Sequence, residues 1–255
     1  MKIAMVSAFT GDMADYGLRM YRSFRRFNPD VPMFFADWHD CPRLPELVTT
    51  GVQVLRADFA VIPAKHPRFR DMLLWPFVKA LEWDALVWID ADTMILRPLT
   101  SLWTGTVDFA GHPDRDNNGM VLRTGWNGAK FCCVPGNDWA KFASGVWMTR
   151  NRALLLDCYR RTMAGHHRGR DSDVLTAVVN ECGYSYHQLD GNLWNFGRQL
   201  IDLARYDGKR ISYTLDGKTY EPYTAGFSRV PVNGVDVRLT SDALDEFYRE
   251  QVGEL

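Results

Sequence analysis

Two aspartates, Asp90 and Asp92, stand directly after a short apolar run and are the residues best suited to chemistry in this chain. The run, residues 86–89, is unbroken and bounded, which predicts a strand buried on both faces. On an extended backbone the i, i+2 spacing places both carboxylates on the same side. Such a pair at the carboxyl end of a strand suits a hard divalent cation held against the phosphates of a ligand. The alternative is a solvated turn that ends a core strand.

The residues before this pair predict the elements that position it. A helix follows the first strand, because apolar residues recur at helical spacing from Leu18 to Phe27. A second helical stripe covers residues 68–83, with a kink expected at Pro76. The strands expected in this half are residues 3–7, 31–36, 52–56 and 86–89. Strand and helix thus alternate, which predicts a parallel sheet with helices on both faces.

The second half of the chain predicts further strands, two internal helices and a C-terminal hairpin. The hairpin, residues 209–223, alternates apolar and polar residues around Asp216-Gly217, and a last amphipathic helix follows it. The other elements expected are strands at 107–111, 144–148 and 184–189 and helices at 153–163, 172–182 and 242–252. The fold class is therefore α/β, with a mixed, mostly parallel sheet flanked by helices, in a single domain over residues 1–255.

Composition narrows the class of partner and the compartment. The 255 residues carry a net charge of −1, so nothing favours a nucleic acid bound through charge. Five cysteines form no CxxC pair and no even set, which favours reduced thiols in the cytoplasm. No signal peptide and no apolar run of membrane-spanning length is expected.

The motif at residues 88–93, WIDADT, followed by Ile95-Leu96-Arg97-Pro98-Leu99, resembles the DxD motif of nucleotide-sugar-dependent glycosyltransferases with the GT-A fold. It is most similar to glycosyltransferase family eight, the glycogenin and bacterial galactosyltransferase group. The resemblance covers residues 1 to about 196 by pattern. It implies a Rossmann-like GT-A sheet with a nucleotide-binding half at 1–97 and an acceptor- and sugar-binding half at 98–255. It also implies that Asp92 binds Mn²⁺ or Mg²⁺ directly, while Asp90 contacts the ribose or shares the metal.

Other family motifs match with departures. The sequence at residues 10–16 makes Tyr16 the candidate to stack on the uracil, and a tyrosine on the helix face is an equal alternative. Ser144 and Gly145 match the small residues that let the donor sugar approach the backbone, although the preceding Asn is lost. Asp171 matches the acid that lines the sugar site, and Ser172 replaces a Gln found near the anomeric carbon. Asp171 and Ser172 also suit a plain helix N-cap.

The remaining candidates are expected to hold the nucleotide. Ala8 and Asp37 follow the first two strands, and Arg70 is the basic residue chosen on the helix before the DxD strand. No His follows His187, so the family's C-terminal metal ligand is missing, and Arg229 stands in for the lysine that contacts the diphosphate. The metal then keeps fewer protein ligands and more water and phosphate oxygens, which Mg²⁺ accepts.

The resemblance implies an enzyme, a metal-dependent hexosyltransferase. It moves a hexose from a nucleotide-diphosphate sugar, with UDP the expected nucleotide, to a hydroxyl acceptor such as a saccharide, with retention at the anomeric carbon. The loop at residues 112–130, with Trp126, is expected to close over the donor and exclude water. A homodimer is possible.

Three other classes of protein stay open. A haloacid-dehalogenase-type phosphohydrolase also places DxD at a strand end, but Met94 stands where that family has Thr or Val. A sugar-phosphate nucleotidyltransferase needs a Gly-rich first loop, and residues 8–12 contain only one glycine. A binding protein for nucleotide sugars without turnover is consistent with the missing His and the change at Ser172.

Overall fold

The computed structural model describes most of the chain. The described residues are 1–9, 13–57, 69–102, 105–114, 141–165, 171–194, 196–226, 229–232, 235–238 and 241–253. The residues of the expected closing loop from 115 onward, Trp126 among them, lie outside these ranges. Among the described helices, none combines the length and apolar character needed to cross a membrane.

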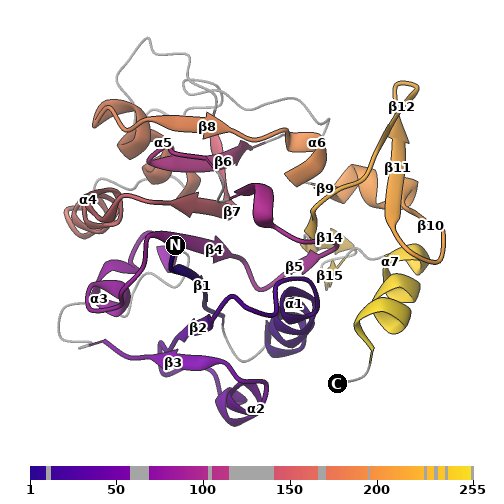
Figure 1. Ribbon diagram of the computed structural model, residues 1–255, viewed down its shortest axis with the longest axis horizontal. Helices are drawn as coiled ribbons and strands as arrows, with labels where there is room; N and C mark the ends of the chain where they lie inside the picture. Colours follow the sequence, from indigo (N-terminus) through magenta and orange to yellow (C-terminus); the bar gives the residue numbers. More distant parts are fainter. Residues whose placement is uncertain are drawn as a thin grey trace.

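A seven-stranded sheet forms the centre of the molecule (Figure 1). Its strands are β1 (Ile3–Ser7), β2 (Met33–Ala36), β3 (Gln53–Leu55), β4 (Ala85–Ile89), β6 (Phe109–Pro113), β7 (Phe142–Thr149) and β8 (Tyr186–Gln188). They lie in the order β3-β2-β1-β4-β7-β6-β8, and β7 alone runs antiparallel to its neighbours in this sheet. The expectation of a mixed, mostly parallel sheet is confirmed.

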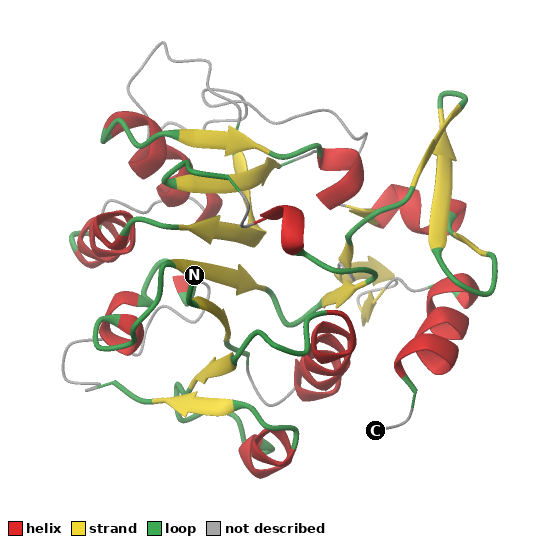
Figure 2. Cartoon of the chain, viewed as in Figure 1, coloured by secondary structure: helices red, strands yellow, loops and turns green. Residues whose placement is uncertain are grey.

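Helices cover both faces of this sheet, and the alternation of side chains explains why both faces are apolar. Val87 and Ile89 of β4 enter one core cluster, while Leu86 and Trp88 enter the other. The helices are α1 (Ala14–Phe27), α2 (Leu44–Thr49), α3 (Trp75–Val78), α4 (Arg152–Met163), α5 (Asp171–Glu181) and α6 (Gly191–Trp194). Figures 1 and 2 show α3 and α4 on one side of the sheet and α1 on the other. A strand buried on both faces therefore carries Asp90, as the apolar run predicts.

The long helix expected over residues 68–83 is wrong. Residues 69–73 form a tight turn, in which the amide of Leu73 donates to the carbonyl of Phe69 at 2.9 Å, and α3 spans only Trp75–Val78. Proline has no amide hydrogen and its ring collides with the carbonyl four residues earlier, so Pro76 is tolerated only in the first turn of a helix. The apolar stripe is buried as expected, but in two short pieces.

A smaller unit packs beside the main sheet. Strand β5 (Thr93–Ile95), directly after the aspartate pair, joins β13 (Thr224–Gly226) and β9 (Phe196–Gly197). The expected hairpin is confirmed as β11 (Ile211–Leu215) and β12 (Lys218–Tyr220), with Asp216 and Gly217 both at positive φ. The other elements are β10 (Arg205–Tyr206), β14 (Arg229–Val232), β15 (Val235–Arg238), 3-10 helices at Thr100–Leu102 and Arg198–Leu203, α7 (Asp242–Phe247) and a π-helical turn (Tyr248–Val252).

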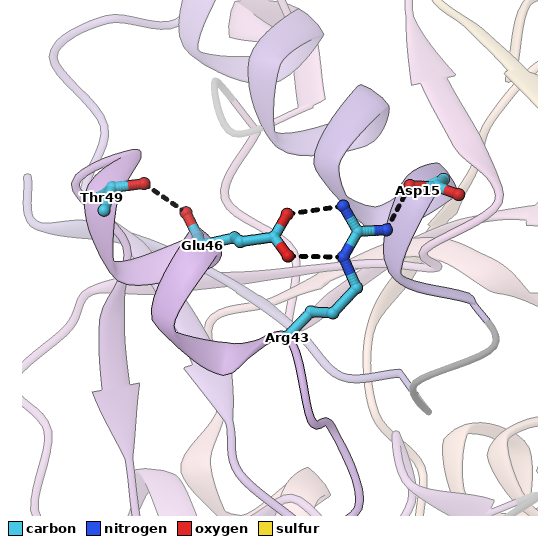
Figure 3. Close-up of polar contacts among 4 residues, drawn as sticks. All are labelled: Asp15, Arg43, Glu46 and Thr49. Carbon is cyan, nitrogen blue, oxygen red and sulfur yellow. Dashed lines mark hydrogen bonds and ion pairs between the residues drawn. The ribbon is translucent and has the colours of Figure 1, made fainter.

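Arg43 ties the beginning of α2 to α1 at the surface (Figure 3). Its Nε donates to Glu46 Oε1 at 2.7 Å and its Nη2 to Oε2 at 2.5 Å, and it also pairs with Asp15 of α1. These hydrogen bonds hold the pKa of Glu46 below its usual value. Because the group is solvent-exposed, we assign it a role in orienting the two helices and little stability.

Gly17 is the point where α1 approaches the loop after β1, and it gives a prediction for stability. A Cβ at this position would lie 2.2 Å from a ring carbon of Phe9, and the ring is held edge-on against Phe35 with centroids 5.0 Å apart. Gly17→Ala gains up to about 1 kcal/mol of helix propensity. We expect the overlap to outweigh it and to lower the free energy of unfolding by about 1–3 kcal/mol in urea denaturation.

Gly105→Ala is the matched control, because a Cβ there meets nothing within 4 Å among the described residues. It should leave the midpoint of unfolding within error. A Gly17→Ala protein as stable as the wild type would contradict the packing of Phe9.

Candidate functional site

The site is built around Asp90, the first residue after β4. Its amide donates to the carbonyl of Gly145 at 2.8 Å, and its Oδ1 accepts from Trp88 Nε1 at 2.8 Å. The strand ends at Ile89, and the amide of Thr93 donates to the carbonyl of Asp90 at 3.1 Å. The extended backbone expected through Asp92 is therefore wrong, since a turn carries Asp92 between β4 and β5.

Two neighbouring residues of β7 connect Asp90 with Asp171: Gly145 lies beside Asp90, and Ser144 contacts Asp171. A Cβ at Gly145 would lie 3.5 Å from Asp90 Oδ2, so the small residue leaves room beside that oxygen. The neighbouring Ser144 hydrogen-bonds the Asp171 side chain. Asp171 begins α5, and its Oδ1 accepts from the amide of Ser172 at 2.7 Å. The structure thus groups Asp90, Ser144, Gly145 and Asp171, as the resemblance implies. Asp171 also accepts a hydrogen bond from an amide in the first turn of α5.

The electrostatics of this group are those of crowded carboxyls on half-buried residues, Asp90, Asp92 and Asp171. Burial raises the pKa of Asp90 well above its usual value, and the negative charges of Asp92 and Asp171 raise it further. Burial also raises the pKa of Asp171, against the hydrogen bonds from the amide of Ser172 and from Ser144. A bound cation would relieve this repulsion, so Asp90 and Asp92 fit a divalent metal. The described residues contain no group of three or more His, Cys, Asp or Glu side chains that could hold one.

Asp71 belongs to this group and was missed from the sequence. It lies in the turn before α3 with 3% of its surface exposed, and its Oδ2 has no hydrogen-bond partner among the described residues. Burial raises its pKa well above the usual value, and Asp171 and Asp90 raise it further. The available signal was a single acid inside the apolar stripe between Phe69 and Met72. Because a helix is expected here from the sequence, Asp71 would be placed on its solvent-exposed face, where charged residues are common.

Lys141 was also missed, and it supplies a buried positive charge. Its Nζ lies 2.8 Å from Asp173 Oδ1 and 3.8 Å from Asp114 Oδ2. Lys141 and Asp173 each expose 7% of their surface. Lys141 also lowers the pKa of Asp171, while Asp114 raises it. No motif signals this cluster, because its residues come from the end of β6, the residue before β7 and the first turn of α5.

The candidates for the nucleotide lie at the carboxyl ends of adjacent strands. Ala8 is buried just after β1, and Asp37 is buried just after β2. Asp37 Oδ1 accepts from the amide of His39 at 2.8 Å, and its Oδ2 lies 3.6 Å from Arg56 Nε. These positions agree with the predicted edge of the sheet, and the contacts of the two residues with a nucleotide stay a prediction.

Three other candidates are placed elsewhere or not described. Tyr16 packs against the core cluster of the C-terminal unit, which favours the helix-face alternative. Arg70 is buried and forms an ion pair with the exposed Asp40, and it lies over the ring of Trp38, 5.6 Å from its centroid. The backbone of Arg229 lies in β14, and its side chain is outside the described part of the structure.

The raised pKa values predict how stability depends on pH. An acid whose pKa is higher in the folded than in the unfolded protein binds its proton more readily when folded. Its stabilising effect is present below the unfolded value, near 3.8, and is lost as the pH rises through the folded value. For Asp71, Asp90 and Asp171 we therefore expect the melting temperature of metal-free protein to rise as the pH falls from 7 toward 5.

Carboxylates whose pKa is lowered by folding have the opposite effect on stability, and this effect appears at lower pH. Asp108, whose pKa is held down by hydrogen bonds from Ser185 and Asn151, loses its contribution only as the pH falls through its lowered value. Calorimetry across pH 4–8 with and without Mg²⁺ checks the prediction, and Mg²⁺ should raise the melting temperature most at pH 7. A melting temperature that falls steadily from pH 7 to 5 would contradict it.

The structure is similar to those of known glycosyltransferases. It matches the galactosyltransferase LgtC, in complex with donor and acceptor sugar analogs, with a TM-score of 0.61 and 14% identity over 98% of this chain and 95% of that one. It matches the glycosyltransferase GlyE of Streptococcus pneumoniae TIGR4 at 0.58 and 15% identity, over 99% of this chain and 60% of that one.

A third structure, the bifunctional glycosyltransferase WbbM, matches with a TM-score of 0.59 and 12% identity, over 98% of this chain and 49% of that one. No protein-family model matches the sequence, and no curated protein matches it. At these identities the likeness is one of fold. It extends over almost the whole chain and confirms the expected architecture, so the protein has the GT-A fold of these glycosyltransferases.

Proposed function

We propose that this protein is a metal-dependent glycosyltransferase that moves a hexose from a UDP-sugar to a hydroxyl acceptor with retention of configuration. One observation carries the proposal, the meeting of Asp90, Gly145 and Asp171 at the carboxyl end of β4 in a GT-A fold. The acceptor class is a saccharide or another hydroxyl compound. The cysteines in the described part of the chain, Cys41, Cys158 and Cys182, are free thiols, which agrees with a cytoplasmic protein.

The donor would lie across the ends of β1, β2 and β4. Ala8 and Asp37 stand where the nucleoside of the donor would lie, beside the strand ends of the nucleotide-binding half. Asp92, on the turn after β4, and Asp90 would hold the cation. When bound, Mn²⁺ or Mg²⁺ supplies positive charge that neutralises the departing diphosphate.

The chain's own residues would act on the sugar. The small residue Gly145 beside Asp90 would leave room for the sugar, and the hydrogen bond from Ser144 would orient Asp171. The anomeric carbon gains positive charge as its bond to the diphosphate lengthens, and the Asp171 carboxylate would stabilise that charge. Lys141 favours the ionised form of Asp171 that this role needs. The acceptor hydroxyl would then attack from the open side.

The structural similarity to a glycosyltransferase over 98% of the chain favours glycosyl transfer over the phosphohydrolase alternative. Release of nucleoside diphosphate from a panel of nucleotide sugars, measured with Mn²⁺, Mg²⁺ or EDTA, tests the proposal. We expect one UDP-sugar to be hydrolysed slowly without acceptor, faster with one, and not at all in EDTA. Metal-dependent binding without release would identify a binding protein. Release of phosphate from simple phosphomonoesters would identify a phosphohydrolase.

A further inference from the structure

We propose that a cavity between α1, α2 and the turn Tyr248–Val252 is a second binding site, in which Arg22 and Arg26 hold the phosphate group of a phosphate ester. The cavity has a volume of about 770 Å³, a size typical of sites for small organic molecules. All three segments contribute side chains to its lining.

The cavity lies toward the opposite end of the sheet from the aspartate pair. Strands β1 and β2 are parallel, so α1 starts at the carboxyl end of β1 and returns toward the beginning of β2. Arg22 and Arg26 stand in the second half of α1. Asp90 follows the carboxyl end of β4, which is parallel to β1. A ligand in the cavity would therefore leave the donor site free, and its binding does not depend on the proposed function.

Arg22 and Arg26 are cations without a bonding partner. They are four residues apart, so they lie on the same face of α1, where like charges repel each other. Both line the cavity, and among the described residues neither takes part in a hydrogen bond or ion pair. Arg22 is half-buried with its Nε enclosed, so its stem is packed and its guanidinium is held in place. A phosphate would supply the negative charge and the acceptor oxygens that both side chains lack.

The other charged groups of the cavity are already engaged. Glu46, the one acid among the described lining residues, accepts hydrogen bonds from Arg43 at 2.7 and 2.5 Å (Figure 3). These bonds, and to a smaller extent the charge of Arg22, lower the pKa of Glu46. Arg25 donates to the carbonyl of Pro29 at 2.6 Å and so fastens the end of α1. The described lining thus offers positive charge and no unpaired carboxylate, which favours an anion.

Apolar side chains in the same cavity indicate that the anion has an organic part. Leu18 and Val252 line the cavity from two different segments and expose only 6% and 8% of their surfaces. An organic group placed over them would remove apolar surface from water while the phosphate contacts the arginines. A free phosphate ester and the headgroup of a phospholipid present this same chemistry.

The alternative is a helix end whose cations are simply solvated. Basic residues in the last turn of a helix are stabilised by its dipole, and Arg25 and Arg26 occupy that turn. This explanation does not include Arg22, which stands before the last turn. Arg160→Gln is the matched control, because Arg160 is exposed in the last turn of α4 and does not line the cavity.

The experiment measures phosphate binding from both sources. Calorimetric titration with inorganic pyrophosphate in EDTA, which keeps metal out of the donor site, tests a free phosphate. Cosedimentation with vesicles of phosphatidylcholine, with or without phosphatidic acid, tests a lipid headgroup. We expect the wild type and Arg160→Gln to bind equally well in at least one assay. The double variant Arg22→Gln, Arg26→Gln should bind at least about 10-fold more weakly.

The outcomes separate the sources and can overturn the site. Cosedimentation that requires phosphatidic acid would identify a lipid headgroup, and pyrophosphate binding without cosedimentation would identify a free phosphate ester. Absence of binding in both assays, full binding by the double variant, or an equal loss in Arg160→Gln would overturn the proposal. Should the double variant not fold, Arg26→Gln, at an exposed position, must weaken binding by itself, and unchanged binding would overturn the proposal. None of these results requires cleavage of a nucleotide sugar, so failure of the proposed function would leave this test valid.

Discussion

Asp92→Asn is expected to lower kcat/KM for nucleotide-sugar cleavage by at least about 100-fold and to remove the stimulation by Mn²⁺ or Mg²⁺. Asp92 stands on the turn between β4 and β5, and is half-buried there. An amide offers the cation a neutral oxygen in place of a charged one, so the affinity for metal falls with the charge of the ligand set. Because Asp92 also raises the pKa of Asp90, the substitution should lower that pKa and relieve repulsion in the folded protein.

The loss of activity should therefore come without loss of stability, and this combination is diagnostic. Nucleoside diphosphate release over a range of metal concentrations measures the first effect, and thermal unfolding in EDTA measures the second. Asp84→Asn is the control, since Asp84 lies just before β4, is exposed, and accepts a hydrogen bond from the amide of Lys2 at 2.6 Å. Activity in Asp92→Asn that still rises normally with Mn²⁺ would rule out Asp92 as the metal ligand.

The main sheet could be predicted because its signals are local. The apolar run before Asp90 needs no partner to be recognised as a buried strand, and the helical spacing from Leu18 to Phe27 marks α1 by itself. The turn Asp216-Gly217 likewise specifies its hairpin, because both residues tolerate positive φ. In the structure β4 begins at Ala85, one residue before the expected start, α1 begins at Ala14, four residues before Leu18, and the hairpin strands lie within the expected range, from Ile211 to Tyr220.

The errors arise where long-range packing decides. The stripe before Asp90 has helical spacing, yet Pro76 and the packing of Phe69 and Leu73 in the core give a turn followed by one short helix. Strand β5 has only three residues, and its partner β13 lies 129 positions further along the chain by their paired residues Ile95 and Thr224. Nothing in either segment alone specifies that pairing. A sequence pattern identifies which face of a helix or strand is apolar. It does not identify the distant helix or strand that packs against that face.

The candidate site divides in the same way. Asp90, Gly145 and Asp171 could be found because a motif fixes each of them, and the fold then brings them together. Asp71 and Lys141 belong to no motif, and their roles follow from burial, which the sequence does not give. Arg70, one residue before Asp71, illustrates this limit: in the turn that replaces the expected helix, Arg70 pairs with Asp40, while Asp71 is buried and its pKa is raised by burial and by Asp171 and Asp90.

Lys141→Met is expected to lower the free energy of unfolding by about 3–5 kcal/mol. The pair with Asp173 is buried on both sides, and its 2.8 Å contact links the residue before β7 to the first turn of α5. Methionine fills the space of the lysine stem but leaves the Asp173 carboxylate buried without its counter-charge. Urea denaturation at pH 7 measures the effect. Arg161→Met, which breaks the more exposed pair with Glu181, should cost only about 1 kcal/mol or less.

The double variant Lys141→Met, Asp173→Asn tests the reason for the loss. If the penalty comes from an uncompensated buried charge, removing that charge as well should recover most of the stability, and the two substitutions will not be additive. If the double variant is less stable than Lys141→Met, the contribution of Lys141 lies in packing and the electrostatic explanation is wrong. In the double variant Asp171 still lacks the cation that lowers its pKa. As the pH is lowered, we therefore expect the double variant to lose activity at a higher pH than the wild type does. If it does so while remaining stable, the role of Lys141 in folding is separate from its role in keeping Asp171 ionised.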